Sequence, residues 1–91
     1  MTALEETGKL LGRNFARLRR EKLFTQERFA QVSGYAQQYV SDLECGLRNP
    51  TIVTLHHIAS ALGVSHVDLV LPEDDARRED AKPPKRKSGK N

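Results

Sequence analysis

The chain contains 91 residues, which allows one small folded domain. It carries 15 Lys and Arg against 12 Asp and Glu, a formal net charge of +3, and 37% of its residues are hydrophobic, with no tryptophan. A core of that size leaves no room for a deep catalytic cavity, so an enzyme with a small-molecule substrate is not expected. One cysteine excludes an intrachain disulfide and the three histidines lack metal-ligand spacing, so we predict no metal and no cofactor.

The sequence also constrains where the protein is located. No apolar run approaches the roughly 20 residues that a membrane helix needs. The first residues, MTALEETGKLL, lack the basic-then-apolar order of a signal peptide. Together with the single cysteine, these features predict a soluble cytoplasmic protein without a membrane partner.

Composition changes abruptly at Pro72. Residues 1–71 mix apolar and polar residues with a helical period, and we expect them to form the folded domain. Residues 72–91 contain no large apolar residue, so they are predicted to be a disordered charged tail. The domain has 8 basic and 7 acidic residues, the tail 7 and 5, so the domain itself is nearly neutral. The basic end of the tail is interpreted either as a solubility segment or as a helper in phosphate binding.

Apolar spacing and a cap predict the first two helices. The first is expected from about residue 4 to residue 22. Its inward face carries Leu11, Phe15 and Leu18. Thr25 is a suitable N-cap for a short second helix that ends at Gly34. The inward residues of this second helix are expected to be Phe29, Ala30 and Val32.

Three further helices are predicted after Gly34. The third covers about residues 36–45, with Val40 and Leu43 inward. The fourth has the clearest period, and its inward residues are Leu55, Ile58, Ala59 and Leu62. Ser65 and Asp68 resemble a capping box for a last short helix, which Pro72 stops. Five helices without a strand pattern predict an all-α fold.

Residues 26–43 have the spacing of two helices that cross at a sharp turn. Ala30 is a small residue where the axes approach, and Gly34 supplies the turn. Because Val40 and Leu43 anchor the second of these helices inward, its opposite face is presented to solvent. That face carries Gln37, Gln38, Ser41 and Asp42, with Tyr39 alongside.

This arrangement resembles the Cro/C1-type, or XRE, helix-turn-helix family. The resemblance runs from about Leu11 to Leu71 and is carried by LRREKLFTQERFA, YVSDLECG, RNPTIVTLHHIASALGVS and VDL. It implies a compact five-helix, lambda-repressor-like DNA-binding domain. It further implies a transcription regulator that commonly acts as a dimer on a near-palindromic operator.

The paired glutamines are the predicted base readers. A carboxamide offers one donor and one acceptor side by side, which matches the N6 and N7 edge of adenine in the major groove. The resemblance places the main base contacts on Gln37 and Gln38. Without the surrounding pattern, the same two residues would be read as solvated polar side chains.

The resemblance also implies contacts with the DNA backbone, which position a protein without carrying sequence information. The matching residues are Gln26, Tyr39, Ser41, Arg48 and Asn49. For Tyr39 the alternative is a ring half-buried beside the fourth helix, and for Gln26 it is a role in capping its own helix. For Ser41 and Arg48 it is plain solvent exposure.

Other positions are interpreted as structural or as departures from the family. Arg19 and Glu44 match residues that form an internal ion pair in many relatives. Asp42 would repel phosphates, so it is expected to point away or, as the alternative, to accept from a cytosine N4. Neither Tyr35 nor Ala36 can cap the third helix, whose start is expected to fray until DNA binds.

Cysteine and histidine are not expected to be functional. Cys45 stands where the family commonly has a basic residue or asparagine, and a redox role for it is disfavoured. His56 and His57 are adjacent, so they point about 100° apart on a helix and form no chelating pair. His66 is distant from both in sequence.

The last helix predicts a homodimer. Val67, Val70 and Leu71 cannot all face one small core, so this surface and the end of the fourth helix are expected to form a two-fold interface. The two recognition helices would then lie about 34–36 Å apart, one turn of DNA.

Two functions from different classes remain open. The first is a sequence-specific DNA-binding transcription regulator, a small repressor or autoregulator similar to the controller proteins of restriction-modification systems and to phage repressors. The second is an antitoxin or adaptor that uses the same domain to bind a protein partner. A third, minor alternative is non-specific nucleic-acid binding by the basic tail alone.

Overall fold

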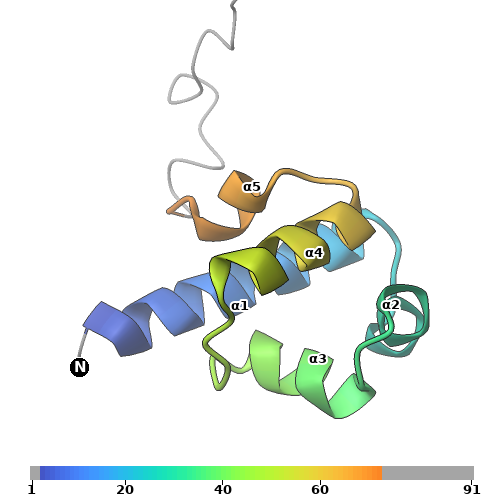
Figure 1. Cartoon of the computed structure of the whole chain (residues 1–91), viewed down its shortest axis with the longest axis horizontal. Helices are drawn as coiled ribbons and strands as arrows, with labels where there is room; N and C mark the ends of the chain where they lie inside the picture. Colours follow the sequence, from blue (N-terminus) through green and yellow to red (C-terminus); the bar gives the residue numbers. More distant parts are fainter. Residues whose placement is uncertain (1–2, 73–91) are drawn as a thin grey trace, which may run out of the picture.

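The computed structural model describes residues 3–72, which form five helices and no strand (Figure 1). The helices are α1 (Ala3–Glu21), α2 (Gln26–Ser33), α3 (Gln37–Glu44), α4 (Ile52–Leu62) and α5 (His66–Val70). The all-α prediction is confirmed. The predicted tail lies outside the described residues, except for its first residue, Pro72.

The caps of α2 and α5 are formed by the predicted residues, and α4 is capped by Thr51. The Thr25 hydroxyl accepts from the backbone N–H of Arg28 at 2.9 Å, and Thr51 caps α4 in the same way. Ser65 and Asp68 form the capping box of α5. At the other ends, Gly34 and Gly63 have φ values of 86° and 80°, the left-handed conformation that glycine adopts without steric cost.

The core is formed by apolar side chains from all five helices. Its buried members are Leu11, Phe15, Leu18, Phe29, Val40, Leu43, Leu55, Ile58, Ala59, Leu62 and Leu69. The ring of Phe29 contacts Phe15 edge-on at a centroid distance of 5.0 Å, so α2 is held against α1. The inward prediction for Val32 is wrong, because Val32 is 47% exposed. Two residues apart on a helix, Ala30 and Val32 point in nearly opposite directions, so both cannot face one core.

Two contacts of α1 were not anticipated from the sequence. Gly12 lies against the end of α3, where a β-carbon would be 2.6 Å from the backbone oxygen of Glu44. Asn14 is completely buried, and its amide donates to the backbone oxygens of Leu69 and Leu71 at 3.0 and 2.7 Å. One side chain of α1 therefore satisfies carbonyl groups at the end of α5.

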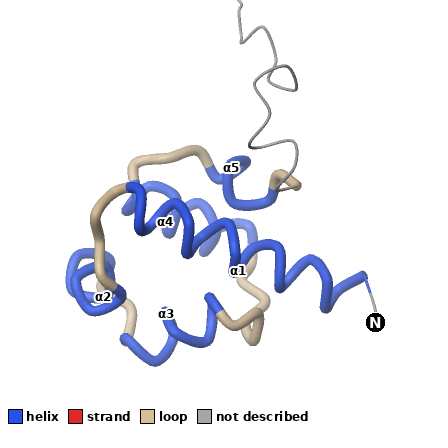
Figure 2. The backbone as a smooth tube through the Cα atoms, turned by 180° about the vertical axis from the view of Figure 1, so that it is seen from behind, coloured by secondary structure: helices blue, strands red, loops and turns tan. Residues whose placement is uncertain are grey.

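The helices are arranged so that α3 and α5 lie on opposite sides of the molecule (Figures 1 and 2). Helices α1 and α4 run between them, α1 contacting both α3 and α5, and α4 contacting α5. The described domain therefore has two separate outer surfaces, one at α3 and one at α5.

Candidate nucleic-acid interface

The buried side of α3 determines which of its residues face solvent. Val40 and Leu43 are each 1% exposed and hold the helix against the core. Gln37 and Gln38, in its first turn, are exposed, while Ser41 is half-buried. The two predicted base readers therefore lie at the outer N-terminal end of α3.

The start of α3 has no side-chain cap. Ala36 is the N-cap residue, and its side chain makes no capping hydrogen bond to the first turn. Helix N-termini carry partial positive charge and exposed N–H donors, which favour an anion such as phosphate. The absence of a cap, predicted from Tyr35 and Ala36, thus coincides with the end of the helix that carries the glutamines.

Asp42 lies between two of the predicted contact residues. Its Oδ1 accepts from Nε2 of Gln38 at 2.9 Å, and its Oδ2 pairs with the guanidinium of Arg48 at 3.4 Å. Asp42 thus contacts two of the predicted contact residues, and its pointing away from DNA stays a prediction. Gln38 and Asp42 are four residues apart on one helix, so their side chains are neighbours. The loop after α3 then brings Arg48 to the same carboxylate.

Two tyrosine rings extend this group on its other side. Tyr35 and Tyr39 are stacked with centroids 5.1 Å apart and an interplanar angle of 19°. The guanidinium carbon of Arg48 lies 4.9 Å from the centre of the Tyr39 ring, within reach of a cation–π interaction. Arg48 is therefore held between the ring of Tyr39 and the carboxylate of Asp42, although its side chain stays 46% exposed.

The phenol of Tyr39 stays protonated over the physiological range. Burial raises its pKa above the usual 10.0, and the neighbouring Tyr35 raises it further, while the positive charge of Arg48 opposes both. The hydroxyl can thus donate a hydrogen bond to a phosphate oxygen. Tyr39 is also half-buried and packed on the core, which agrees with the alternative interpretation of this ring, while its contact with DNA stays a prediction.

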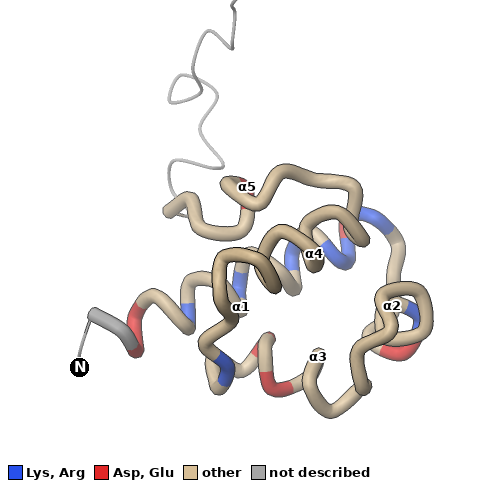
Figure 3. The backbone as a smooth tube through the Cα atoms, viewed as in Figure 1, with Lys and Arg blue, Asp and Glu red and all other residues tan. Residues whose placement is uncertain are grey.

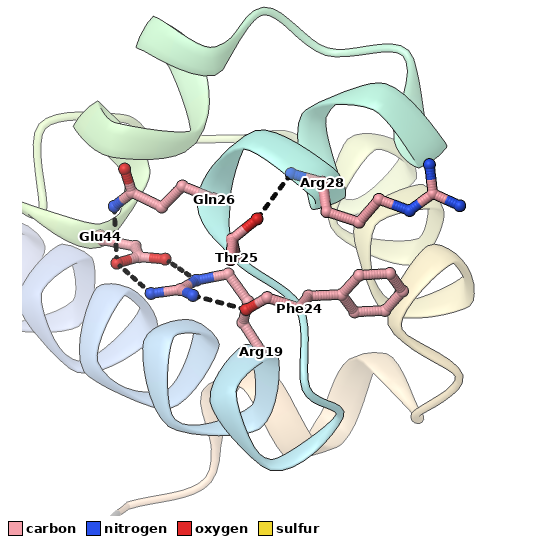
Figure 4. A network of polar contacts seen from close by, with 6 residues as sticks. All are labelled: Arg19, Phe24, Thr25, Gln26, Arg28 and Glu44. Atoms are coloured by element: carbon pink, nitrogen blue, oxygen red, sulfur yellow. Dashed lines mark hydrogen bonds and ion pairs between the residues drawn. The ribbon is translucent and has the colours of Figure 1, made fainter.

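Gln26 enters a second polar group, which joins three segments (Figure 4). Its Nε2 donates to Oε1 of Glu44 at 3.0 Å, and Arg19 pairs with the same carboxylate at 2.5 Å. Arg19 also donates to the backbone oxygen of Phe24 at 2.7 Å. Arg19 and Glu44 are thus paired as expected. Gln26 does not cap α2, since Thr25 does, and its carboxamide is oriented by Glu44 instead.

The charge around α3 is mixed rather than basic (Figure 3). Lys and Arg are concentrated on α1, whereas α3 carries Asp42 and Glu44. Arg48 and the exposed Asn49 follow in the loop before α4. Attraction of an anionic partner to this surface must therefore depend on a few placed groups, as the near-neutral domain suggests.

The other outer surface is apolar. Val67 and Val70 of α5 are 45% and 39% exposed, and Leu71 is half-buried. On α4 the exposed apolar residues are Ile52 and Val53 at its start. The last turn of α4 directs Leu62 into the core, and the contribution of this end of the helix to an interface stays a prediction.

The start of α4 and the start of α5 line an open hollow of about 320 Å³. Its lining residues are Ile52, Val53, His56 and His66. The rings of His56 and His66, distant in sequence, lie 5.9 Å apart between centroids. Within residues 3–72, no group of three or more His, Cys, Asp or Glu side chains is placed to hold a metal ion. Cys45 is exposed.

No helix in the described part of the chain is long and apolar enough to cross a membrane.

Comparison with known proteins gives a consistent result. The model of the family described as "Helix-turn-helix" matches residues 15–69. An uncharacterized HTH-type transcriptional regulator, y4dJ of Sinorhizobium fredii, is 63% identical over 67 residues, which cover 74% of this chain and 87% of that protein.

Two solved structures are similar over most of the chain. The hypothetical transcription factor NHTF from Neisseria superposes with a TM-score of 0.73 at 28% identity, covering 82% of this chain and 86% of its own. The restriction-modification controller protein C.Esp1396I, solved as a tetramer with its natural 35 base-pair operator, has a TM-score of 0.63 at 32% identity. The match covers 76% of this chain and 87% of the controller protein.

Proposed function

The chain belongs to the Cro/C1-type helix-turn-helix family and is a DNA-binding transcription regulator, and we propose that it reads a near-palindromic operator as a homodimer. In this proposal the N-terminal end of α3 enters the major groove, and the regulator is a small repressor or autoregulator. The exposure of Gln37 and Gln38 on a helix whose other side is buried carries the proposal.

The base-reading role is supported by the chemistry of the carboxamide. Gln37 and Gln38 can each offer a donor and an acceptor to the N7 and N6 edge of adenine. Val40 and Leu43 fix the rotation of α3 about its axis. Gln37 and Gln38 are the first two residues of this helix, so their side chains both leave its N-terminal end. A rigid element of this kind loses little entropy when it enters a groove.

The proposed backbone contacts surround these readers. Arg48 and Asn49 come from the loop after α3, Tyr39 and Ser41 from α3 itself, and Gln26 from the start of α2. The side-chain NH₂ of Gln26 has two N–H donors, and one of them donates to Glu44. The other N–H of Gln26 can donate to a phosphate oxygen. These groups would set the register of the protein on the duplex.

The alanine variants of the readers test this function. With an operator selected from a random DNA pool, Gln37→Ala and Gln38→Ala are each expected to weaken binding by about 1–3 kcal/mol, with preference lost at one base pair. The reason is that each deletion removes a donor and an acceptor. Fluorescence anisotropy against operator and scrambled duplexes measures both effects.

Arg48→Ala provides a comparison of a different kind. A phosphate contact carries no sequence information, so this variant should bind every duplex less tightly. The slope of the logarithm of the association constant against the logarithm of the salt concentration should become about one unit less steep. If both glutamine variants bound the selected operator like the unmodified protein, α3 would not be the reading element.

The homodimer is proposed to form through α5, with Val67, Val70 and Leu71 at the interface. Exposed valines on one short helix favour a second copy that buries them, and the same face continues to the hollow beside His66. The controller protein solved with its operator is a tetramer. Half-sites about 34–36 Å apart would suit a two-fold pair of α3 helices.

Val67→Glu tests the dimer. A carboxylate at the centre of an apolar interface is expected to raise the dimer dissociation constant at least about tenfold, ~1.4 kcal/mol, measured by sedimentation velocity. Val32→Glu is the matched control, because Val32 is 47% exposed but lies on α2. Equal dimerisation of both variants would contradict the interface, and an unmodified protein that stayed a monomer on its operator would contradict the dimer itself.

The remaining features follow from this role. We propose that the regulatory domain comprises residues 1–71, acts in the cytoplasm and catalyses no reaction. A protein partner in place of a second copy on the α5 surface is the competing proposal, an antitoxin or adaptor. It would be favoured if Val67→Glu left self-association unchanged while both glutamine variants kept full operator affinity.

A further inference from the structure

We propose that Asp42 is a positioning residue that determines the base preference of Gln38. The proposal rests on the proposed base-reading role of Gln38. It assigns a function to a carboxylate that, by charge alone, opposes DNA binding.

The geometry gives Asp42 two partners on the outer surface of α3. One carboxylate oxygen accepts from Nε2 of Gln38 at 2.9 Å, and the other pairs with Arg48 at 3.4 Å. Arg48 is itself positioned over the ring of Tyr39. The side chain of Asp42 is 23% exposed, against 46% for that of Arg48, so the carboxylate is less accessible to solvent than the guanidinium with which it pairs.

A carboxylate selects one end of a carboxamide. An ionised Asp accepts hydrogen bonds and cannot donate, so it binds the NH₂ end of Gln38 and excludes the reversed orientation. The oxygen of Gln38 is then directed away from Asp42 as an acceptor. Without this contact, a 180° rotation of the amide would exchange donor and acceptor at almost no energetic cost.

A fixed acceptor distinguishes the bases in the major groove. Adenine N6 and cytosine N4 are donors there, whereas guanine O6 and thymine O4 are acceptors that would repel the oxygen of Gln38. Adenine also provides N7 for the remaining N–H of the amide. Asp42 should therefore make Gln38 prefer adenine or cytosine over guanine or thymine, with adenine best.

The same carboxylate has an opposite effect on affinity. Its charge repels phosphates at any DNA sequence, although Arg48 compensates part of this repulsion. Removal of the charge should thus strengthen binding to all DNA and weaken discrimination at one base pair. A purely structural role would not change these two quantities in opposite directions.

The test is Asp42→Asn in the full chain, measured by fluorescence anisotropy. The base pair read by Gln38 is first identified as the one at which Gln38→Ala loses preference. Four duplexes that differ only there are then compared. Asparagine can donate or accept toward Gln38, so preference for adenine or cytosine over guanine or thymine should fall about tenfold. Binding to scrambled DNA should rise severalfold.

Glu27→Gln is the charge control, because Glu27 is an exposed carboxylate in the first turn of α2. It should raise general DNA affinity without changing base preference. Thermal unfolding should be nearly unchanged in Asp42→Asn, since an exposed pair contributes little to stability.

The outcomes separate the two proposals. If Asp42→Asn raises affinity as Glu27→Gln does and keeps full base preference, Asp42 acts only as a charge and the positioning role is wrong. If Gln38→Ala changes preference at no base pair, the base-reading role of Gln38 itself fails, and the positioning role fails with it.

Discussion

Replacement of Glu44 by alanine is expected to lower the free energy of unfolding by about 3–5 kcal/mol, the cost of leaving one partner of a buried ion pair uncompensated. Both side chains of the pair are only 11% exposed, so water replaces the lost carboxylate poorly. Glu44 also accepts from Gln26, and Arg19 in turn holds the backbone of Phe24. One substitution therefore loosens the junction of α1, α2 and α3.

Urea unfolding at a fixed protein concentration measures this effect, because self-association would otherwise shift the midpoint. The matched control is Glu21→Ala. Its pair with Arg17 spans 3.4 Å within α1, with side chains 58% and 27% exposed, and its loss should cost at most about 0.5 kcal/mol. If the Glu44 variant were no less stable than the Glu21 variant, the expected loss would be contradicted. The attraction between Arg19 and Glu44 would then do no more than offset the free energy of removing the two charges from water.

Replacement of Gly12 by alanine is expected to cost about 3 kcal/mol, the upper end of the range for overpacking. The new β-carbon would lie 2.6 and 2.7 Å from the backbone oxygens of Glu44 and Leu43, which cannot rotate away as a side chain could. Helices α1 and α3 must then separate. Because α3 carries the proposed base readers, operator affinity should fall as well.

Gly8→Ala is the control for helix propensity. Gly8 lies one turn earlier on α1, and its β-carbon would be 3.2 Å from the backbone oxygen of Gly46. The gain of about 1 kcal/mol from alanine in a helix should offset this milder contact, so stability should change little. Thermal unfolding of the two variants compares them directly. Similar melting temperatures would mean that α1 and α3 adapt to a β-carbon at Gly12.

The sequence by itself determined the helices and the surface that α3 presents. Caps such as Thr25 and Ser65 act within one turn, and the glycine at position 34 is required by its own backbone conformation. The inward spacing of Val40 and Leu43 was enough to expose Gln37 and Gln38. These features are local, and their physical causes lie within a few residues of chain.

Only the tertiary structure decided how distant groups pair. Asn14 reaches the end of α5, and His56 approaches His66, because the loops bring helices together in a way that periodicity does not specify. Asp42 shows the same limit in the binding surface. Its charge suggested avoidance of DNA, but its contacts with Gln38 and Arg48 depend on one helical turn and on the path of the following loop. A residue pattern determines which face a side chain occupies, whereas its hydrogen-bond partners are determined by packing.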